Sequence, residues 1–300
     1  MRQATLRPTT AMFDHVEAFY QPGSVSEAIR MLRRGGNGAR FVAGGTDIVV
    51  QADRSIRFLV NLKQLGLDYI RRRENAYVIG ATTTMTVIEE SPQLCTLANG
   101  ILAKAASTCG SVQIRNMATV GGNLANASPA ADTATPLLVL DASVVLSSSR
   151  GQRKIALADF FLGPHKTAAA GALLTEVVIP IPPRGGRIGW SFQKLGRVEG
   201  DIAVVSASAG LQLDRAGRCK WGRIALGAVA PTPLRACSAE NLLAGQQLEM
   251  GLIERVSDEV AREVSPITDL RASAEYRRDM SRLLVWRALR ECAARAGYSI

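Results

Sequence analysis

Histidine and cysteine, the residues that most often bind metals or act as bases and nucleophiles, are scarce in this chain. His15 and His165 are the two histidines among 300 residues, and they belong to no H-x-x-x-H or H-E-x-x-H pattern. The five cysteines are odd in number and widely spaced, at positions 95, 109, 219, 237 and 292. This spacing indicates neither a disulfide framework nor a C-x-x-C site. We therefore expect no zinc or iron–sulfur cluster in this chain, and we interpret both histidines as surface or packing residues.

Three signature motifs are also missing. The chain has no G-x-G-x-x-G after a strand, no G-x-x-x-x-G-K-[ST] and no G-x-S-x-G. These absences disfavour a Rossmann nucleotide-binding protein, a P-loop NTPase and an α/β-hydrolase. Because histidine is so rare, general-base and nucleophilic catalysis also lack their commonest residue. If the chain is an enzyme, we expect a cofactor to supply the chemistry.

Long apolar runs are lacking as well. The most apolar stretch, residues 135–146, is interrupted by Asp141 and is too short for a membrane span. The N-terminus, M-R-Q-A-T-L-R-P-T-T, has no apolar core of the kind found in signal peptides. We predict a cytoplasmic chain without a membrane span.

Aromatic residues make up only 5% of the chain, whereas the net charge is +10. This charge is compatible with nucleic acid, an acidic partner or an anionic cofactor. The arginine clusters at 33–34, 71–73 and 271–290 are dispersed and are not interleaved with stacking rings. That dispersion argues against nucleic acid as a partner, and we interpret the clusters as solvated faces or helix ends.

The composition that is present, 47% hydrophobic and 21% charged residues, is typical of a globular protein with about two domains. A linker is predicted where Pro180, Pro182, Pro183, Gly185 and Gly186 follow one another. We therefore expect an N-terminal extension at 1–12, a first α+β domain at 13–184 and a second α+β domain at 187–300.

Hydrophobic periodicity predicts the elements of both domains. In the first domain we expect strands at 13–19, 40–43, 58–62, 144–147, 153–157 and 173–181, with a hairpin at 69–79. Helices are expected from the capping box at Ser24 to Gly35-Gly36, at 84–90, and at 94–108, the last ended by Gly110. In the second domain we expect strands at 189–194, 202–213 and 221–229 and helices at 239–242, 251–264 and 274–296.

Two glycine pairs are the candidates for ligand binding. Gly44-Gly45, followed by Thr46, comes just after a predicted strand and offers backbone N–H groups to an anion. The second pair lies in residues 118–132, A-T-V-G-G-N-L-A-N-A-S-P-A-A-D, which we place in a loop. Its side chains can bond phosphate, ribose or ring carbonyls through Thr119, Asn123, Asn126, Ser128 and Asp132. The alternative is an ordinary turn region.

Both glycine segments together resemble one family. F-V-A-G-G-T-D-I at 41–48 and V-Q-I-R-N-M-A-T-V-G-G-N-L-A-N-A-S-P-A-A-D at 112–132 resemble the pyrophosphate loops of the FAD-binding medium subunit of the molybdenum hydroxylases, the family of xanthine dehydrogenase and aerobic carbon monoxide dehydrogenase. Five further features follow in the family's order: F-F-L-G-P-H-K-T from Phe160, the strand ending I-P-I-P-P, F-Q-K-L-G-R-V-E-G-D-I-A from Phe192, G-A-V-A-P-T-P-L-R-A from Gly227 and S-A-E-Y-R-R-D-M from Ser273. The resemblance covers nearly everything from Phe13 to the C-terminal helix.

The resemblance implies an α+β fold. Residues 13–184 would form a two-part FAD-binding domain of the vanillyl-alcohol-oxidase (PCMH) type, made of two α+β subdomains. Residues 187–300 would form the C-terminal flavoprotein domain, with a three-stranded antiparallel sheet and helices. The motif at Pro231 and the helix start at Tyr276 and Arg277 are interpreted mainly as packing features of this domain.

The resemblance also implies the cofactor, FAD, and the residues that hold it. Backbone amides of the first segment would surround the pyrophosphate, the second segment would line the diphosphate and ribityl chain, and Lys194 would approach the flavin from the second domain. Because phosphate repels carboxylates, Asp47 and Asp132 are expected to bond hydroxyls or backbone N–H groups. Val198 departs from the family, which often has a second arginine after Arg197. The predicted cofactor-binding set is Phe41, Val42, Ala43, Gly44, Gly45, Thr46, Asp47, Ile48, Gly110, Ala118, Thr119, Gly121, Gly122, Asn123, Asn126, Ser128, Asp132 and Lys194.

The function that the resemblance implies is electron transfer. FAD in this chain would take electrons singly from a small partner subunit with two 2Fe-2S clusters and release them to NAD+ or another acceptor. A large subunit would carry the molybdenum cofactor, and the assembly would be a dimer of heterotrimers. This chain would then contain no catalytic acid or base and no metal site of its own.

Two alternatives stay open at this point. The first is a stand-alone flavin oxidase or reductase of the same fold; against it, no histidine lies in or beside either glycine segment for covalent flavin attachment. The second is a basic module that binds nucleic acid or assists assembly, with glycine segments that are only structural.

Overall fold

The computed structural model describes residues 15–182 and 185–300. The extension expected at 1–12 lies outside the described residues. Of the strand expected at 13–19, the described residues 15–17 are not in a strand, and residues 18 and 19 belong to β1 (Ala18–Tyr20). Among the described residues, no helix combines the length and the apolar character that crossing a membrane requires.

A small parallel sheet opens the fold. Its strand order is β1, β3 (Phe58–Asn61), β2 (Ala39–Val42), and α1 (Val25–Gly35) packs against it. The capping box predicted at Ser24 is confirmed, because the Ser24 hydroxyl accepts a hydrogen bond from the N–H of Glu27 and the Glu27 carboxylate accepts one from Gly23. The helix ends at Gly36, whose φ is +54°. Three short elements complete this part: η1 (Gly36–Gly38), α2 (Thr46–Gln51) and η2 (Lys63–Leu65).

A five-stranded antiparallel sheet forms the centre of the first domain. Its order is β4 (Ile70–Arg73), β5 (Ala76–Gly80), β10 (Leu173–Pro180), β6 (Ser143–Ser148), β7 (Gly151–Ala156). The predicted hairpin at 69–79 is confirmed as β4 and β5. Helical elements connect β5 to β6: α3 (Met85–Glu90), α4 (Pro92–Thr96), η3 (Leu97–Gly100), α5 (Ile101–Ser107), α6 (Val112–Met117), α7 (Val120–Ala125) and α8 (Ala134–Val139). After β7 come η4 (Leu157–Asp159) and the hairpin of β8 (Phe161–Gly163) and β9 (Lys166–Thr167).

Two sequence predictions about this region are wrong. The single helix expected at 94–108 is broken at Ala98 and Asn99, whose φ angles are +50° and +56°. The Asn99 side chain there accepts a hydrogen bond from the backbone N–H of Trp190 at 2.9 Å, so a tertiary contact accompanies the break in an otherwise helical pattern. Residues 118–132 are also not loop throughout, because α7 forms within them.

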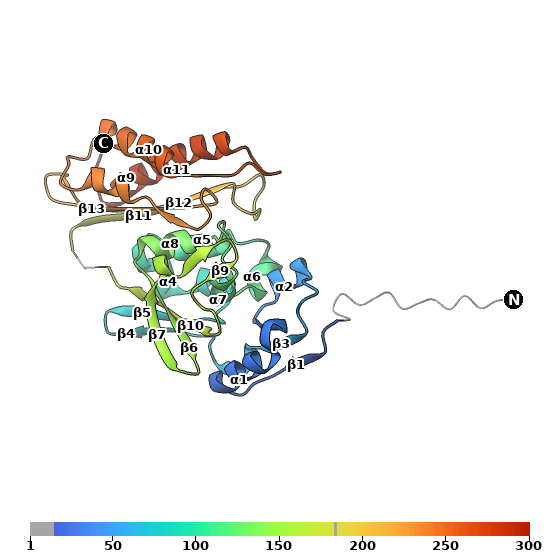
Figure 1. Ribbon diagram of the computed structural model, residues 1–300. Helices are drawn as coiled ribbons and strands as arrows, with labels where there is room; N and C mark the ends of the chain where they lie inside the picture. Colours follow the sequence, from blue (N-terminus) through green and yellow to red (C-terminus); the bar gives the residue numbers. More distant parts are fainter. Residues whose placement is uncertain (1–14, 183–184) are drawn as a thin grey trace.

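The second domain is a four-stranded antiparallel sheet with helices on one face. The three predicted strands are confirmed as β11 (Arg187–Leu195), β12 (Val205–Leu213) and β13 (Cys219–Gly227), and the two-residue strand β14 (Leu234–Arg235) adds an edge that the sequence did not predict. The predicted helices correspond to α9 (Cys237–Leu243), α10 (Met250–Glu263) and α11 (Ala274–Arg295). Figure 1 shows α10 and α11 covering the outer face of this sheet, while α5 and α8 of the first domain lie against its inner face.

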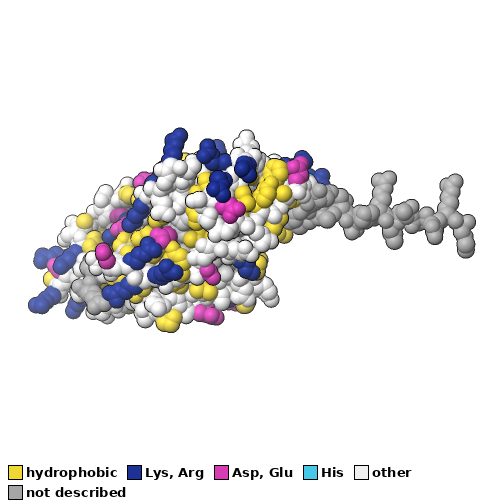
Figure 2. All heavy atoms as spheres, turned by 90° about the horizontal axis from the view of Figure 1, so that it is seen from below, with side chains coloured by type: hydrophobic (Ala, Val, Ile, Leu, Met, Phe, Trp, Pro, Cys, Tyr) yellow, Lys and Arg dark blue, Asp and Glu magenta, His cyan; other side chains and the backbone are white. Residues whose placement is uncertain are grey.

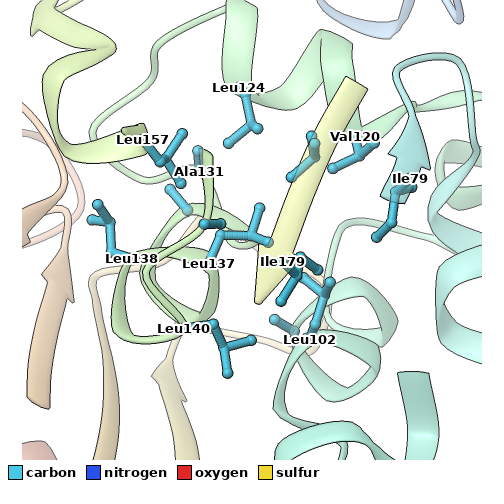
Figure 3. Close-up of a cluster of buried hydrophobic side chains, with 14 of the residues drawn as sticks. Ile79, Leu102, Val120, Leu124, Ala131, Leu137, Leu138, Leu140, Leu157 and Ile179 are labelled. Atoms are coloured by element: carbon cyan, nitrogen blue, oxygen red, sulfur yellow. The ribbon is translucent and has the colours of Figure 1, made fainter. Parts of the chain in front are cut away.

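The core of the first domain is built partly from the glycine-rich stretch. Val120, Leu124 and Ala131 point into the buried cluster formed by β5, β10, α5 and α8 (Figure 3). Two buried aromatic side chains of β11, Trp190 and Phe192, belong to the same cluster. The first core is therefore shared between the two halves of the chain.

Candidate cofactor site

Here the segment 41–48 is called the first loop, and 118–132 the second loop. They approach each other at Gly44, where a Cβ atom would overlap the carbonyl group of Met117 just before the second loop. Only a residue without a side chain permits this approach. Next to it, Gly45 has a φ of +72° and precedes Thr46, the first residue of α2, without any side-chain cap. The first N–H groups of α2 are therefore left to an acceptor other than a capping side chain.

The two glycines of the second loop have different surroundings. Gly121 donates its N–H to the carbonyl of Ala81 at 2.9 Å, and a Cβ there would lie 2.6 Å from the Ala81 side chain. At Gly122 a Cβ would meet only the Thr119 hydroxyl within 4 Å, at 3.0 Å. That hydroxyl caps α7 by accepting the N–H of Gly122. Gly121 is thus packed against the protein, whereas Gly122 borders space that a ligand can use.

Most polar side chains of the second loop already have partners within the chain. Asn123 accepts a hydrogen bond from the Thr133 hydroxyl at 2.6 Å, and the Ser128 hydroxyl accepts one from the N–H of Ala130 at 3.2 Å. Asn126 donates to Asp47 of the first loop at 2.9 Å. These hydrogen bonds therefore shape the two loops.

Lys194 reaches the second loop from β11. Its ammonium donates to Asp132 Oδ2 at 2.9 Å and to the carbonyl of Thr108 at 2.8 Å, with both charged side chains over nine-tenths buried. Burial raises the pKa of Asp132 to about 6, although Lys194 opposes the shift. The second carboxylate oxygen, Oδ1, is buried and has no hydrogen-bond partner among the described residues. An unpaired buried acceptor fits a ligand hydroxyl or N–H.

Within the chain, the two aspartates bond groups other than the expected hydroxyls or backbone N–H groups: Asp132 bonds the Lys194 ammonium and Asp47 bonds the Asn126 amide. A ligand hydroxyl or N–H at Asp132 Oδ1 stays a prediction. For Asp132, burial explains the difference, because a carboxylate removed from water is best compensated by an opposite charge. The pKa of Asp47 is also raised, because partial burial outweighs the opposing attraction of His165.

The remaining predicted residues surround this arrangement at different depths. Phe41 and Val42 belong to β2, and Ala43 follows it; Phe41 and Ala43 pack against a small buried cluster, and Ile48 lies within α2. Ala118 is buried and accepts a hydrogen bond from the N–H of Met85. Gly110 has a φ of +65°, and a Cβ atom added at Gly200 of the second domain would lie 3.0 Å from the Gly110 carbonyl oxygen. Gly110 lies in the turn after α5, which ends earlier than predicted, at Ser107.

Sequence reasoning missed His165. The turn between β8 and β9 places it against the second loop, with its ring Nδ1 2.9 Å from the carbonyl oxygen of Asn126. The prediction that no histidine lies beside either glycine segment is therefore wrong. His165 and Asn126 are 39 positions apart in the chain, so no local sequence pattern indicates that the fold brings them together. The F-F-L-G-P-H-K-T motif was the one available signal, and it does not indicate a contact.

Two motifs of the second domain have structural roles in the structure. Arg197 pairs with Asp201 at 2.8 Å, and the exposed Val198 contributes no second arginine. Arg277 is buried at the start of α11, donates to the carbonyls of Val204 and Ala228, and pairs with Asp269. The packing interpretation is confirmed for Arg277, whereas the side chain of Tyr276 is exposed.

The described residues contain no group of three or more His, Cys, Asp or Glu side chains that could hold a metal ion. On the face shown in Figure 2, Lys and Arg side chains are spread among hydrophobic and neutral patches and do not gather in one place.

Comparison with known proteins gives this site a context. The sequence model of the family described as "FAD binding domain in molybdopterin dehydrogenase" matches residues 11–182, and that of the "CO dehydrogenase flavoprotein C-terminal domain" matches residues 190–292. The carbon monoxide dehydrogenase medium chain of Afipia carboxidovorans is 33% identical over 283 residues, which cover 93% of this chain and 97% of the relative. The alpha subunit of the 6-hydroxypseudooxynicotine dehydrogenase complex of Paenarthrobacter nicotinovorans is 33% identical over 296 residues, 95% of each chain.

A solved structure agrees. Carbon monoxide dehydrogenase from Hydrogenophaga pseudoflava superposes with a TM-score of 0.89 at 30% identity and covers 93% of this chain and 98% of the other. The fold and the two family matches together define a flavoprotein with an FAD-binding domain and a C-terminal domain of the CO dehydrogenase type. The chain belongs to the FAD-binding medium subunits of the molybdenum hydroxylases, the xanthine dehydrogenase and carbon monoxide dehydrogenase family, and is an oxidoreductase subunit.

Proposed function

We propose that this chain holds FAD between the first and second loops and passes electrons from an iron–sulfur partner to an acceptor. The observation that carries the proposal is the close approach of Gly44 in the first loop to Met117, which directly precedes the second loop, together with the unpaired Oδ1 of Asp132 in the second loop. When bound, FAD would supply the redox chemistry, since flavins exchange electrons singly or in pairs.

The roles of the chain's own groups follow from their contacts. The uncapped N–H groups at Thr46 and Asp47 would face the diphosphate, because a helix start favours negative charge. Gly122 would let the backbone approach the cofactor, and Asp132 would accept a hydrogen bond through Oδ1. Lys194 would act on the flavin mainly by holding Asp132, because its ammonium is already shared with that carboxylate and Thr108. None of these groups needs to exchange a proton with a substrate.

We also propose the domain division at the 180–186 linker, with an FAD-binding domain at 13–184 and a flavoprotein C-terminal domain at 187–300. The two family matches support it, because one ends at residue 182 and the other begins at 190. Part of the linker lies outside the described residues.

The partners are inferred from the relatives. Several are named as medium chains or medium subunits, which supports an assembly with a larger and a smaller subunit. We propose that the large subunit carries the molybdenum cofactor, that the small one carries two 2Fe-2S clusters, and that the whole is a dimer of heterotrimers with NAD+ or another acceptor.

The test begins with the chain purified from its native host together with whatever binds it. We expect a yellow protein with stoichiometric FAD, two co-purifying subunits, and reoxidation of the reduced flavin by NAD+ or by another small acceptor. A chain that stays colourless after refolding with excess FAD contradicts the proposal. A flavin-loaded chain that turns over a small substrate without partners supports a stand-alone flavin enzyme instead.

A further inference from the structure

His165 lies at the turn of the β8–β9 hairpin and contacts the end of α7. Its backbone N–H donates to the carbonyl of Ala127 at 3.1 Å, and its ring Nδ1 is 2.9 Å from the carbonyl oxygen of Asn126. A carbonyl can only accept, so Nδ1 carries the proton in this contact. Both carbonyls come just after the last residue of α7, where helices leave acceptors without intrahelical partners.

The backbone of His165 supports a specific role. Its φ is +56°, in the left-handed region that side-chain-bearing residues rarely adopt. Ala127, which it contacts, has a φ of +48°. Two residues in disfavoured conformations are thus joined by a backbone hydrogen bond, and such backbone strain persists where the surrounding contacts determine it.

Asn126 continues the connection to the first loop. Its side-chain amide donates to Asp47 Oδ1 at 2.9 Å, and its Oδ1 accepts a hydrogen bond from Gln51 of α2 at 3.1 Å. Asn126 therefore contacts the β8–β9 hairpin through its backbone carbonyl and α2 through its side chain. The hairpin, the second loop and the first loop form one hydrogen-bonded series.

We propose that His165 is a positioning residue of the FAD site: by fixing Asn126, it sets the distance between the two cofactor loops. The inference rests on the proposed function, because it requires that these loops bind FAD. His165 itself need not touch the cofactor.

Two substitutions separate the ring from the backbone. His165→Gly keeps the backbone N–H and adopts a positive φ without strain, but it removes the ring. His165→Asn also tolerates the left-handed region, and its amide can donate to the Asn126 carbonyl from nearly the position of Nδ1. Lys166→Ala is the matched control, because Lys166 is the exposed neighbour on the same hairpin.

FAD binding to the full-length apo chain is measured by quenching of flavin fluorescence, and folding by the unfolding midpoint of each apo variant. We expect His165→Gly to weaken FAD binding about five- to tenfold, the value of one hydrogen bond. His165→Asn and Lys166→Ala are expected to stay within about twofold of the parent. If His165→Gly binds FAD like the parent, or if His165→Asn is as weak as the glycine variant, the inference is wrong.

A double-mutant cycle with Asn126→Ala tests the connection. When the Asn126 side chain is absent, His165→Gly should cost at least about threefold less in FAD affinity than it does in the parent. Additive effects overturn the role through Asn126. If His165→Gly does not fold, FAD binding by Asn126→Ala is the remaining test. A loss of FAD affinity in that variant supports the inference, and an unchanged affinity contradicts it. A parent chain that binds no FAD is a different result, because it contradicts the proposed function itself.

Discussion

Gly121 and Gly122 are neighbours in the chain but differ in what surrounds them. The first is packed on Ala81 and the second borders open space beside the Thr119 hydroxyl. A sequence pattern cannot distinguish them, because both are simply glycines of one G-G pair. The structure packs Gly121 against Ala81, and we propose that Gly122 borders the cofactor.

This difference predicts opposite behaviour in two variants. Gly121→Ala should lower the free energy of unfolding of the apo chain by about 1–3 kcal/mol, since the added methyl is forced against Ala81. Gly122→Val should change that free energy by less than about 1 kcal/mol, yet abolish retention of FAD. Urea unfolding of both apo variants and an absorbance spectrum after incubation with FAD provide the check. Full FAD occupancy in the Gly122 variant would mean that the second loop is misassigned.

The Asp132–Lys194 pair predicts a dependence of stability on pH. Burial raises the pKa of Asp132 in the folded chain to about 6 from its ordinary 3.8, so the folded state binds a proton more tightly than the unfolded state. The resulting stabilisation is fully present below 3.8 and is lost as the pH rises through about 6. Asp132→Asn removes this dependence.

We therefore expect the free energy of unfolding of the apo parent, relative to that of Asp132→Asn, to increase as the pH is lowered from about 7 to about 5. Urea unfolding of both proteins at the two pH values measures it. A relative stability that decreases over this range would show that the attraction of Lys194 outweighs burial and holds the pKa below its ordinary value.

Among the elements, the turn that precedes α2 and the end of α6 meet at a point where no side chain fits. The contact of Gly44 with Met117 joins the small parallel sheet to the helical part of the first domain. We expect this contact to matter both for folding and for cofactor binding, because the positions of both loops depend on the close approach of Gly44 to Met117.

Gly44→Ala is expected to destabilise the apo chain by about 1–3 kcal/mol or more and to weaken FAD binding in the same variant. Gly23→Ala is the control: its Cβ would have no neighbour closer than 3.8 Å. Thermal unfolding and FAD titration of both variants test this pair. Parent-like FAD affinity in Gly44→Ala would show that the loops need not approach this closely.

Several elements were predictable because their signals are local. The helix after Ser24, the hairpin of β4 and β5 and the strands β11 to β13 follow from caps, turns and alternation of side chains. The break at Ala98 and Asn99 was not, since the apolar period continues through it and Asn99 bonds Trp190, 91 positions later. Strand β14 was missed because two residues carry no alternation.

At the scale of the whole molecule, the first core contains side chains from both halves of the chain. Trp190 and Phe192 of β11 lie in the cluster built by β5, β10 and α8. Arg235 adds polar links across the same boundary, because it bonds the carbonyl of Leu138 and the carboxylate of Asp141. The two domains should therefore unfold together.

We expect a single unfolding transition for the apo parent, and a loss of about 3–5 kcal/mol in Phe192→Ala, which empties a fully buried site. Differential scanning calorimetry of both proteins, with tryptophan fluorescence as a second probe, measures this. Two separated transitions in the parent would show that the cores are independent.

The family, the two glycine segments and most regular elements could be predicted from the sequence, because these depend on residue types at short spacing. Which distant groups meet depends on how the chain packs: Gly44 with Met117, Lys194 with Asp132, and His165 with Asn126. Lys194 and Asp132 are 62 positions apart, so no local period places them together. Such contacts arise when sheets and helices pack to bury apolar surface, which brings distant polar groups into a shared site.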